Sequence, residues 1–461
     1  MARMFGTDGV RGVANLDPMS PELVLALGRA AVRVLVPSTT STAKPCFVIG
    51  RDTRLSGSML EAALIAGICS AGANVLKVGI LPTPGVAYLT RAMGGAAGVM
   101  ISASHNPYMD NGVKFFSAQG RKLEDHLEGE IEKQVHDALT GDRPTGKAIG
   151  ETECCAEPRQ RYIEFLSATY HQEKPLSLRI GLDCANGAAS EVAPALFTQL
   201  GAQVHVWHAS PDGLNINEQC GALYPEFLQQ KVVDERLDIG FAFDGDADRL
   251  IAIDHTGRIL DGDYILAICS KALLASDVAL GPVVVSTVMA NLGLERALQQ
   301  MGLELHKTQV GDRHVVQAMQ QRGAVLGGEQ SGHIVFLQYH TTGDGLLTAI
   351  QLLNVVMAQR TSLAELAQSF YKFPQVLLNV KVLGRIDPMT TPSVQEVIQH
   401  VEGILGSDGR VVVRLSGTEL VARVMVEGRD EAMITLLAQH IAQTIARELG
   451  PSLSSADNMA G

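Results

Sequence analysis

Residues 46–78, CFVIGRDTRLSGSMLEAALIAGICSAGANVLKV, contain the pattern that decides the fold class of this chain. A short apolar run leads into a polar loop, a segment of helical period follows, and Gly72 separates it from a second apolar run. This order predicts a strand, a helix and a second strand, with the glycine in the left-handed position that ends the helix. The stretch therefore predicts an α/β unit.

The same order of elements occurs twice more, at residues 178–206 and 283–305. Three copies predict three related α/β domains, and we expect their sheets to be mixed. One large doubly wound sheet is the alternative, but the wide spacing between the copies disfavours it.

The C-terminal part of the chain follows a different pattern, in which short strands alternate with two helical segments. We expect strands at 376–383, 411–413 and 424–426, and helices at 394–405 and 430–449. This order predicts a fourth, smaller α+β domain. The Ser- and Asp-rich residues after Pro451 are expected to be disordered.

The bulk composition limits the classes of function. The chain has 461 residues, which is too many for one hydrophobic core and suggests roughly three domains from length alone. A net charge of −12 disfavours broad nucleic-acid binding. The chain lacks an apolar run of about 18 residues, so we expect no membrane span.

The cysteines and the N-terminal residues predict a cytoplasmic protein. The seven cysteines are an odd number without C-x-x-C spacing, which indicates reduced thiols rather than disulfides or a zinc site. The opening residues MARMFGTDGVRG lack the apolar core of a secretion signal. The sequence does not determine the oligomeric state, and a homodimer is compatible with it.

The first loop that could carry chemistry is Ile101-Ser102-Ala103-Ser104-His105-Asn106-Pro107, which follows an apolar stretch. A polar loop that leaves a strand can present the hydroxyl of Ser104, and Lys114 follows Pro107 by seven residues. On this segment alone a plain turn is an equal alternative. A hydrolase is disfavoured because the G-x-S-x-G elbow is missing.

The second loop places Asp244, Asp246 and Asp248 at alternating positions directly after an apolar strand. Three carboxylates so close repel one another unless a cation lies between them, and all-oxygen ligands suit magnesium or calcium. A standard calcium-binding EF-hand is excluded, because Arg249 and His255 occupy the positions that need glycine and glutamate. A solvated acidic turn is the remaining alternative.

Two further loops are rich in polar groups. Gly327-Gly328-Glu329-Gln330-Ser331-Gly332-His333 offers donors and acceptors that suit sugar hydroxyls, although a surface turn is as good an interpretation. Arg414-Leu415-Ser416-Gly417-Thr418-Glu419, with Arg423 beyond it, can hold a phosphate dianion. A hairpin turn with solvated arginines is the alternative, and the Gly-Lys-Ser/Thr ending of a Walker loop is absent.

These four loops, in this order and on four predicted domains, resemble the α-D-phosphohexomutase family. The resemblance extends from Phe5-Gly6-Thr7-Asp8-Gly9-Val10-Arg11-Gly12 to Val424-Met425-Val426-Glu427-Gly428. The sugar loop with Gln330, together with Thr341-Thr342-Gly343-Asp344-Gly345 and Val310-Gly311-Asp312-Arg313, is similar to the branch that acts on glucosamine phosphates.

The resemblance implies a fold and a domain plan. It implies four domains around a central cleft, each contributing one loop. The boundaries that we predict are a phosphoserine domain at 1–152, a metal-binding domain at 153–257, a sugar-binding domain at 258–371, a phosphate-binding domain at 372–449 and a disordered tail at 450–461.

The resemblance also implies residue roles. Ser104 would carry the phosphate, and a phosphate oxygen on it would join Asp244, Asp246 and Asp248 in binding Mg²⁺. The catalytic surroundings would be Arg11, Lys114, Arg249 and His333. The sugar hydroxyls would bind Glu329 and Ser331, and the non-reacting phosphate would bind Arg414, Ser416, Gly417, Thr418 and Arg423.

The implied activity interconverts glucosamine 6-phosphate and glucosamine 1-phosphate through a phosphoserine and glucosamine 1,6-bisphosphate, which also serves as the activating phosphate donor. Such an activity feeds UDP-N-acetylglucosamine and cell-wall precursor synthesis. A mutase for mannose or glucose phosphates is one rival, and a non-catalytic phosphosugar-binding protein is another. Two departures from the family pattern, Leu420 for proline and Leu223 for threonine, remove none of the expected ligands.

Overall fold

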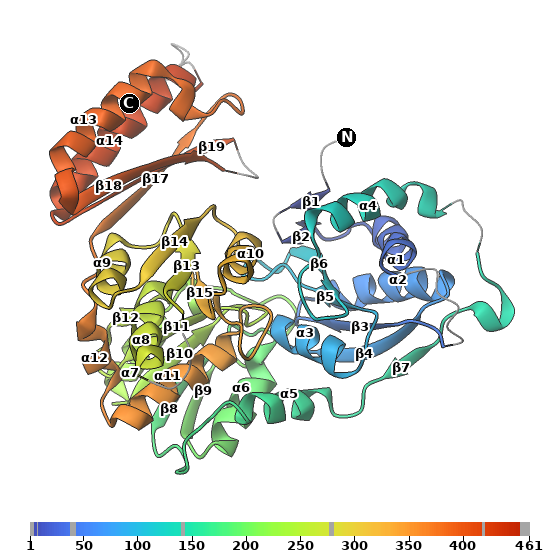
Figure 1. The fold of residues 1–461 in the computed structure, drawn as a ribbon. Helices are drawn as coiled ribbons and strands as arrows, with labels where there is room; N and C mark the ends of the chain where they lie inside the picture. The colour runs from blue at the N-terminus through green and yellow to red at the C-terminus, as the bar shows by residue number, and fades with distance from the viewer. Residues whose placement is uncertain are drawn as a thin grey trace, which may run out of the picture. The chain divides into compact units, whose positions relative to one another are not determined.

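The computed structural model describes residues 4–6, 8–36, 43–139, 143–275, 281–416 and 420–451. It divides into two compact units, one of residues 1–287 with 303–369 and the other of residues 288–302 with 370–461. The first unit holds three mixed sheets and the second holds one antiparallel sheet (Figure 1). No helix in the described part of the chain is long and apolar enough to cross a membrane.

The first sheet has seven strands in the order β1-β2-β6-β5-β3-β4-β7, and its parallel half runs from β5 to β7. The helices α1, α2 and α4 pack on one face, where Phe47, Ile49 and Val99 meet Leu27 and Leu64. The strands are β1 (Phe5–Gly6), β2 (Gly9–Val13), β3 (Cys46–Arg51), β4 (Asn74–Ile80), β5 (Ala97–Ile101), β6 (Asp110–Ser117) and β7 (Thr152–Cys154), and the helices are α1 (Pro21–Leu35), α2 (Gly57–Ser70), α3 (Thr83–Ala92) and α4 (Asp125–Val135).

The second sheet has the order β12-β11-β10-β8-β9, with β10, β8 and β9 parallel and the other pairs antiparallel. Its parallel strands end side by side, so the loops that leave them lie along one edge of the sheet. The elements are α5 (Pro158–Ser167), β8 (Arg179–Asp183), α6 (Ala189–Gln199), β9 (Gln203–Trp207), α7 (Glu226–Asp234), β10 (Ile239–Phe243), β11 (Leu250–Asp254) and β12 (Ile259–Leu260).

The third sheet has the order β14-β13-β15-β16, in which only β16 is antiparallel to its neighbour. Apolar residues of α10 pack with those of β13 and β16 to form its core. The elements are α8 (Gly262–Leu274), β13 (Val283–Thr287), β14 (Glu304–Thr308), α10 (Asp312–Arg322), β15 (Leu326–Gly328), β16 (Ile334–Phe336), α11 (Gly345–Gln359) and α12 (Leu363–Leu366).

The C-terminal sheet has three antiparallel strands in the order β17-β19-β18, and its two long helices cover one face of it (Figure 1). The helix α9 (Leu292–Gln300) belongs to the same unit, because Asn291 bonds Phe373 and Glu427 accepts the amide of Leu292. The elements are β17 (Gln375–Lys381), α13 (Pro392–Leu405), β18 (Gly409–Leu415), β19 (Val421–Gly428) and α14 (Glu431–Leu449).

The sequence prediction of three strand-helix-strand units and a smaller α+β domain is confirmed. The predicted pairs form as the parallel neighbours β3 and β4, β8 and β9, and β13 and β14. Gly72, Gly201 and Gly302 follow the three helices with φ values of 94°, 95° and 76°, which is the left-handed conformation that a helix end requires. The four domain boundaries stay predictions; β7 spans the first of them and pairs with β4. Most of the predicted tail, residues 452–461, lies outside the described residues.

Candidate active site

Three of the four predicted loops follow strands of three different sheets: Ser104 follows β5, the acidic triplet follows β10, and Glu329 follows β15. The first two meet directly, because Ser104 Oγ donates a hydrogen bond to Asp244 Oδ2 at 2.7 Å across 140 residues of sequence. The third joins through His333, whose Nδ1 lies 3.6 Å from Asp248 Oδ2. The first unit therefore brings together a hydroxyl, three carboxylates and an imidazole.

The backbone of Ser104 is held in an uncommon conformation. Its φ is 52°, in the left-handed region that a serine seldom adopts, and the residue is 1% exposed. The Ser102 hydroxyl accepts its amide hydrogen at 2.9 Å, and Asn217 Nδ2 donates to its carbonyl oxygen at 2.9 Å. These bonds fix the direction in which the Ser104 hydroxyl points, so that it faces Asp244.

Arg54 also supports the Ser104 loop. It is the largest fully buried side chain of the described residues, at 1% exposure. Its guanidinium donates to the carbonyl oxygens of Ser104, Asn106, Pro107 and Asp110, and its Nε donates to Asp52 Oδ2 at 2.8 Å. Asp52 also accepts the hydroxyl hydrogen of Ser102 at 2.6 Å. A planar group with five donors is suited to gather several carbonyls, and a lysine could not replace it.

The acidic triplet, which we define as Asp244, Asp246 and Asp248, fits a hard divalent cation. All three residues are at most 4% exposed, and one oxygen of each lies within 4.8 Å of the others. The Oδ1 atoms of Asp246 and Asp248 are buried without a hydrogen-bond partner among the described residues. Burial and the charges of Asp248 and Asp246 raise the pKa of Asp244 to about 8, so the triplet holds three charges at neutral pH only with a cation between them.

Lys114 lies beside the triplet and is 1% exposed. Its Nζ is 2.8 Å from Asp246 Oδ2, 2.9 Å from Asp8 Oδ2 and 3.7 Å from Asp248 Oδ2. Burial opposes the charge on Lys114, but Asp246, Asp8 and Asp248 outweigh it and raise the pKa of the ammonium. Lys114 is therefore a fixed positive charge at the centre of the site.

Asp8 and Asp312 pair with further positively charged side chains near Lys114. Lys122 contacts both carboxylates, and Asp8 also pairs with Arg11. Burial alone would raise the pKa of Asp8, but Lys114, Lys122 and Arg11 hold it well below its usual value. The result is an alternating arrangement of partly buried charges in which Asp8 and Asp312 each have a cationic neighbour.

His333 lies between two carboxylates and is 3% exposed. Its Nε2 is 3.5 Å from Asp312 Oδ2, on the side opposite to Asp248. Burial lowers the pKa of His333, but Asp248 and Asp312 outweigh burial and raise it above the ordinary value. Gly343 leaves room for the ring, because a Cβ at that position would stand 2.4 Å from Nε2.

Arg11 and Arg249, the two predicted catalytic arginines, lie next to the Ser104 loop and the acidic triplet. Arg11 Nη1 donates to the carbonyl oxygen of Ala103 at 3.4 Å, and the amide of Arg249 donates to Asp244 Oδ1 at 3.2 Å. The Nε atoms of both arginines are buried without a hydrogen-bond partner in the described structure. These donors are available to an anionic ligand next to Ser104 and the triplet.

Of the predicted sugar ligands, Glu329 accepts the amide hydrogen of Gly311 through Oε1 at 3.0 Å. Ser331 Oγ is buried and has no hydrogen-bond partner among the described atoms. A hydroxyl left without a partner in a protein interior is costly, so a ligand that bonds to it would be stabilised.

The phosphate loop lies in the second unit. Arg414 on β18 and Arg423 on β19 are directly opposite one another in the antiparallel register, so both side chains are on one face of the sheet. Ser416 follows β18 and is 6% exposed. Gly417 and Thr418 lie outside the described residues. Two opposed guanidinium groups are favourable when an anion binds them both.

The sequence interpretation missed five residues of this site. Asp8 and Asp312 lie in motifs that support the family resemblance, but neither had been given a role. Arg54 and Asn217 act on the backbone of the Ser104 loop, and Lys122 carries no motif signal. Leu420 and Leu223, the two departures from the family pattern, are 50% and 46% exposed.

Known proteins match this chain along most of its length. Four phosphoglucomutase/phosphomannomutase family models match the chain: α/β/α domain I at residues 2–141, domain II at 160–257, domain III at 261–373 and the C-terminal domain at 377–444. The chain belongs to the phosphoglucomutase/phosphomannomutase family and is an enzyme of the phosphosugar mutase class.

Individual relatives match this chain over nearly its whole length. Proteins named phosphoglucosamine mutase from Desulforamulus reducens and Syntrophotalea carbinolica are 48% and 50% identical over 446 and 450 residues. These matches span 96% and 97% of this chain and 99% and 98% of the relatives. The crystal structure of a phosphoglucomutase/phosphomannomutase family protein from Burkholderia thailandensis has the same fold, with a TM-score of 0.78, 24% identity and coverage of 96% of this chain and 97% of that one.

Proposed function

We propose that this chain is a phosphoglucosamine mutase, which interconverts glucosamine 6-phosphate and glucosamine 1-phosphate through a phosphorylated Ser104. The observation that carries the reaction type is the 2.7 Å hydrogen bond between Ser104 Oγ and Asp244 in a buried triplet of carboxylates. The observation that supports the substrate is the 48–50% identity to proteins of that name over nearly their whole length.

The reaction needs a phosphoryl carrier because the two ends of one sugar cannot exchange a phosphate directly. In the first half, the phosphorus–oxygen bond to Ser104 Oγ breaks and a bond to the free sugar hydroxyl forms, giving glucosamine 1,6-bisphosphate. The hydroxyl proton goes to a basic group of the site, and Ser104 leaves as an alkoxide that takes up a proton. The bisphosphate then reverses its orientation, and the other phosphate returns to Ser104.

Residues of this chain would stabilise the charge of the moving phosphoryl group. Lys114, which is buried, and the partly exposed Arg11 and Arg249 would present positive charge to the equatorial oxygens of a phosphoryl group on Ser104. Burial of Ser104 and Lys114 would also keep water from competing with the sugar hydroxyl. Asp244, Asp246 and Asp248 would hold Mg²⁺ together with a phosphate oxygen, and the ion would neutralise charge on the transferring group.

The non-reacting phosphate would bind Arg414, Ser416 and Arg423, with Gly417 and Thr418 between them in sequence. Guanidinium groups recognise phosphate without reading the sugar, so one loop can serve both orientations of the bisphosphate. Loss of one charge-assisted contact costs about 1.5–3 kcal/mol. Arg423→Ala should therefore weaken binding of the 1-phosphate and of the 6-phosphate alike.

Glu329 and Ser331 would bind sugar hydroxyls, and these contacts do not by themselves select the amine at carbon 2. We expect glucosamine 6-phosphate to be preferred, glucose 6-phosphate to follow and mannose 6-phosphate, with its axial hydroxyl, to be used least. A buried polar group left unpaired corresponds to about ten- to a hundredfold discrimination. The cytoplasm, where such phosphosugars are made and used, is the proposed location, in keeping with seven free cysteines in the described structure.

A mutase assay across the three 6-phosphates, with glucosamine 1,6-bisphosphate as activator, tests this proposal. We expect kcat/KM to fall in the order glucosamine, glucose, mannose. Comparable values for mannose 6-phosphate would move the chain to a rival specificity. No turnover of any of them, with no added phosphate in an intact-mass spectrum, would instead support a non-catalytic phosphosugar-binding protein.

A further inference from the structure

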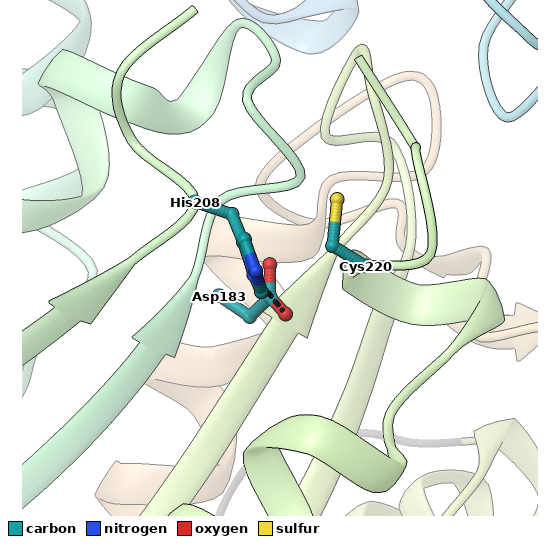
Figure 2. Close-up of side chains that lie close together, drawn as sticks. All are labelled: Asp183, His208 and Cys220. Carbon is teal, nitrogen blue, oxygen red and sulfur yellow. Dashed lines mark hydrogen bonds and ion pairs between the residues drawn. The ribbon is translucent and has the colours of Figure 1, made fainter. Parts of the chain in front are cut away.

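A second cluster of potential ligands lies on the second sheet, outside the groups used above. Figure 2 shows its members: Asp183 at the end of β8, His208 directly after β9, and Cys220 directly before the short 3₁₀ helix η3 (Gly221–Leu223). One ligand atom of each lies within 4.8 Å of the other two. We call these three residues the mixed cluster, because they offer oxygen, nitrogen and sulfur.

The chemistry of the mixed cluster differs from that of the acidic triplet. Thiolate, imidazole and carboxylate are the ligands of zinc and similar cations, whereas magnesium takes oxygen alone. A thiolate and a carboxylate carry two negative charges, which balance a divalent cation, and three protein ligands leave a fourth position for water. We propose that Asp183, His208 and Cys220 bind a thiophilic divalent cation such as Zn²⁺, and that its binding slows the mutase.

Burial and access support a cation site here. Asp183 is fully buried and Cys220 is 1% exposed, whereas the His208 side chain is 27% exposed and provides a route from solvent. Asp183 Oδ1 already accepts the amide of Ala185, which leaves Oδ2, now 2.9 Å from His208 Nδ1, to face the cluster.

Cation binding would change the protonation of the mixed cluster. Burial, with Asp183 nearby, raises the pKa of the Cys220 thiol to about 12, so without a cation the sulfur keeps its proton. On binding, the thiol proton leaves to solvent and a sulfur–metal bond forms, while the imidazole coordinates in its neutral form. The step involves no oxidant or reductant.

The loop that carries Cys220 also supports the backbone of Ser104 through hydrogen bonds. Asn217, three residues earlier, donates from Nδ2 to the carbonyl oxygens of Ser104 and Asn106 at 2.9 and 3.1 Å. Asn217 and Gln219 have φ values of 60° and 50°, so this short segment is tightly bent. A change in the position of Cys220 is therefore transmitted over only three residues to the support of Ser104.

Coordination would change the spacing of these groups. Zinc–sulfur and zinc–nitrogen bonds of about 2.3 and 2.0 Å place tetrahedral ligands roughly 3.5 Å apart, whereas His208 Nδ1 and Asp183 Oδ2 are now 2.9 Å apart. Cation binding would therefore reposition the ligands, and a shift of Cys220 would move the segment that carries Asn217. A misplacement of about 1 Å at a reacting group can cost up to a hundredfold in rate.

Cobalt(II) provides the first test, because a cobalt–thiolate bond gives a charge-transfer absorption in the near ultraviolet that oxygen ligands cannot give. The full chain in saturating Mg²⁺ should develop this band with one equivalent of Co²⁺, and Zn²⁺ should remove it. His208→Ala and Cys220→Ala should lose the band. His205→Ala, which removes a histidine of β9 that pairs with Glu235, and Cys269→Ala, which removes another buried thiol, should keep it. Absence of the band in the parent chain would overturn the site.

Turnover provides the second test, and this half of the inference rests on the proposed mutase activity. In saturating Mg²⁺, Zn²⁺ at the concentration that displaces cobalt should lower kcat at least about tenfold in the parent and in His205→Ala. His208→Ala should resist this inhibition. Equal inhibition of all variants would place the effect on the acidic triplet and overturn the inhibitory role. A cobalt band in a chain without mutase activity would instead contradict the proposed function and leave the cation site standing.

Discussion

The acidic triplet and the mixed cluster lie at the same edge of the same sheet, yet they differ in ligand chemistry. The triplet follows β10, while Asp183 and His208 lie at the ends of β8 and β9, the next strands in the order. All three members of the triplet are buried carboxylates, and Lys114 and Ser104 contact them. The mixed cluster contains one carboxylate, and its partners are an imidazole and a thiol.

Strand ends therefore position polar groups without deciding their chemistry. The parallel strands of an α/β sheet bring several loops to one edge, so neighbouring loops can form separate sites. Loops from the other two sheets of the first unit reach the triplet through Ser104 and His333. Four variants, taken in order of decreasing effect on turnover, test whether catalysis belongs to the triplet alone.

Ser104→Ala should have the largest effect. Removal of the hydroxyl that contacts Asp244 should lower turnover by more than roughly a thousandfold, since loss of a nucleophile in other enzymes costs up to about a millionfold. The thermal unfolding midpoint should change little. Cys220→Ala is the counterpart in the mixed cluster and should keep basal turnover within about threefold. Full activity in Ser104→Ala would contradict the phosphoserine mechanism.

Asp246→Asn should have the next largest effect. It removes a charge from the triplet, so Mg²⁺ affinity and turnover should each fall, turnover by about a hundredfold. Chelation by EDTA should abolish activity in the parent, and added Mg²⁺ should restore it. Asp183→Asn should leave the Mg²⁺ dependence unchanged while costing about 1–3 kcal/mol of unfolding free energy. Activity that survives thorough chelation would exclude the metal role.

Arg54→Lys tests a positioning residue rather than a ligand. A lysine keeps the charge but cannot reach the four carbonyl oxygens that Arg54 now gathers, so Ser104 should lose its fixed direction. We expect kcat to fall at least about tenfold with KM nearly unchanged. The rate of Ser104 phosphorylation, followed by intact mass on folded protein, should fall in parallel. A fall in stability alone, with normal kcat per folded molecule, would show that Arg54 acts only on folding.

Gly343→Ala should have the smallest effect of the four. An added Cβ would overlap the His333 ring at 2.4 Å and push it away from Asp248 and Asp312. A loss of about tenfold in kcat is expected, less than the roughly hundredfold or more that a catalytic acid or base contributes. Gly384→Ala is the matched control, because a Cβ there meets nothing within 4 Å. Identical kinetics for both variants would show that the position of His333 does not limit the rate.

The secondary structure was largely predictable because its signals are local. Each strand-helix-strand unit is a change of apolar period within about thirty residues, and Gly72, Gly201 and Gly302 end the three helices as expected. The serine loop and the acidic loop were also visible, since each directly follows an apolar run that forms β5 or β10. The grouping of α9 with the C-terminal sheet was not predictable, because its contacts with Phe373 and Glu427 lie 82 and 135 residues away.

The contacts that organise the site lay beyond sequence reasoning for the same reason. Arg54 lies between β3 and α2, and no residue near it in the sequence indicates that its guanidinium binds four backbone carbonyls of residues 104–110. Backbone acceptors exist at every residue, so no motif marks the ones that are used. Lys122 likewise belongs to the site only because it pairs with Asp8 and Asp312, which are distant from it in sequence.

The α/β architecture, the family and the residue types at each loop follow from the amino-acid sequence, because periodicity and motifs are properties of short stretches of chain. Tertiary structure alone decided which of these groups meet. It turned Ser104 toward Asp244, set His333 between two carboxylates and gathered Asp183, His208 and Cys220 into a second cluster. The physical reason is that charge, burial and hydrogen bonding act over a few ångströms in space, between residues that the chain separates by tens or hundreds of positions.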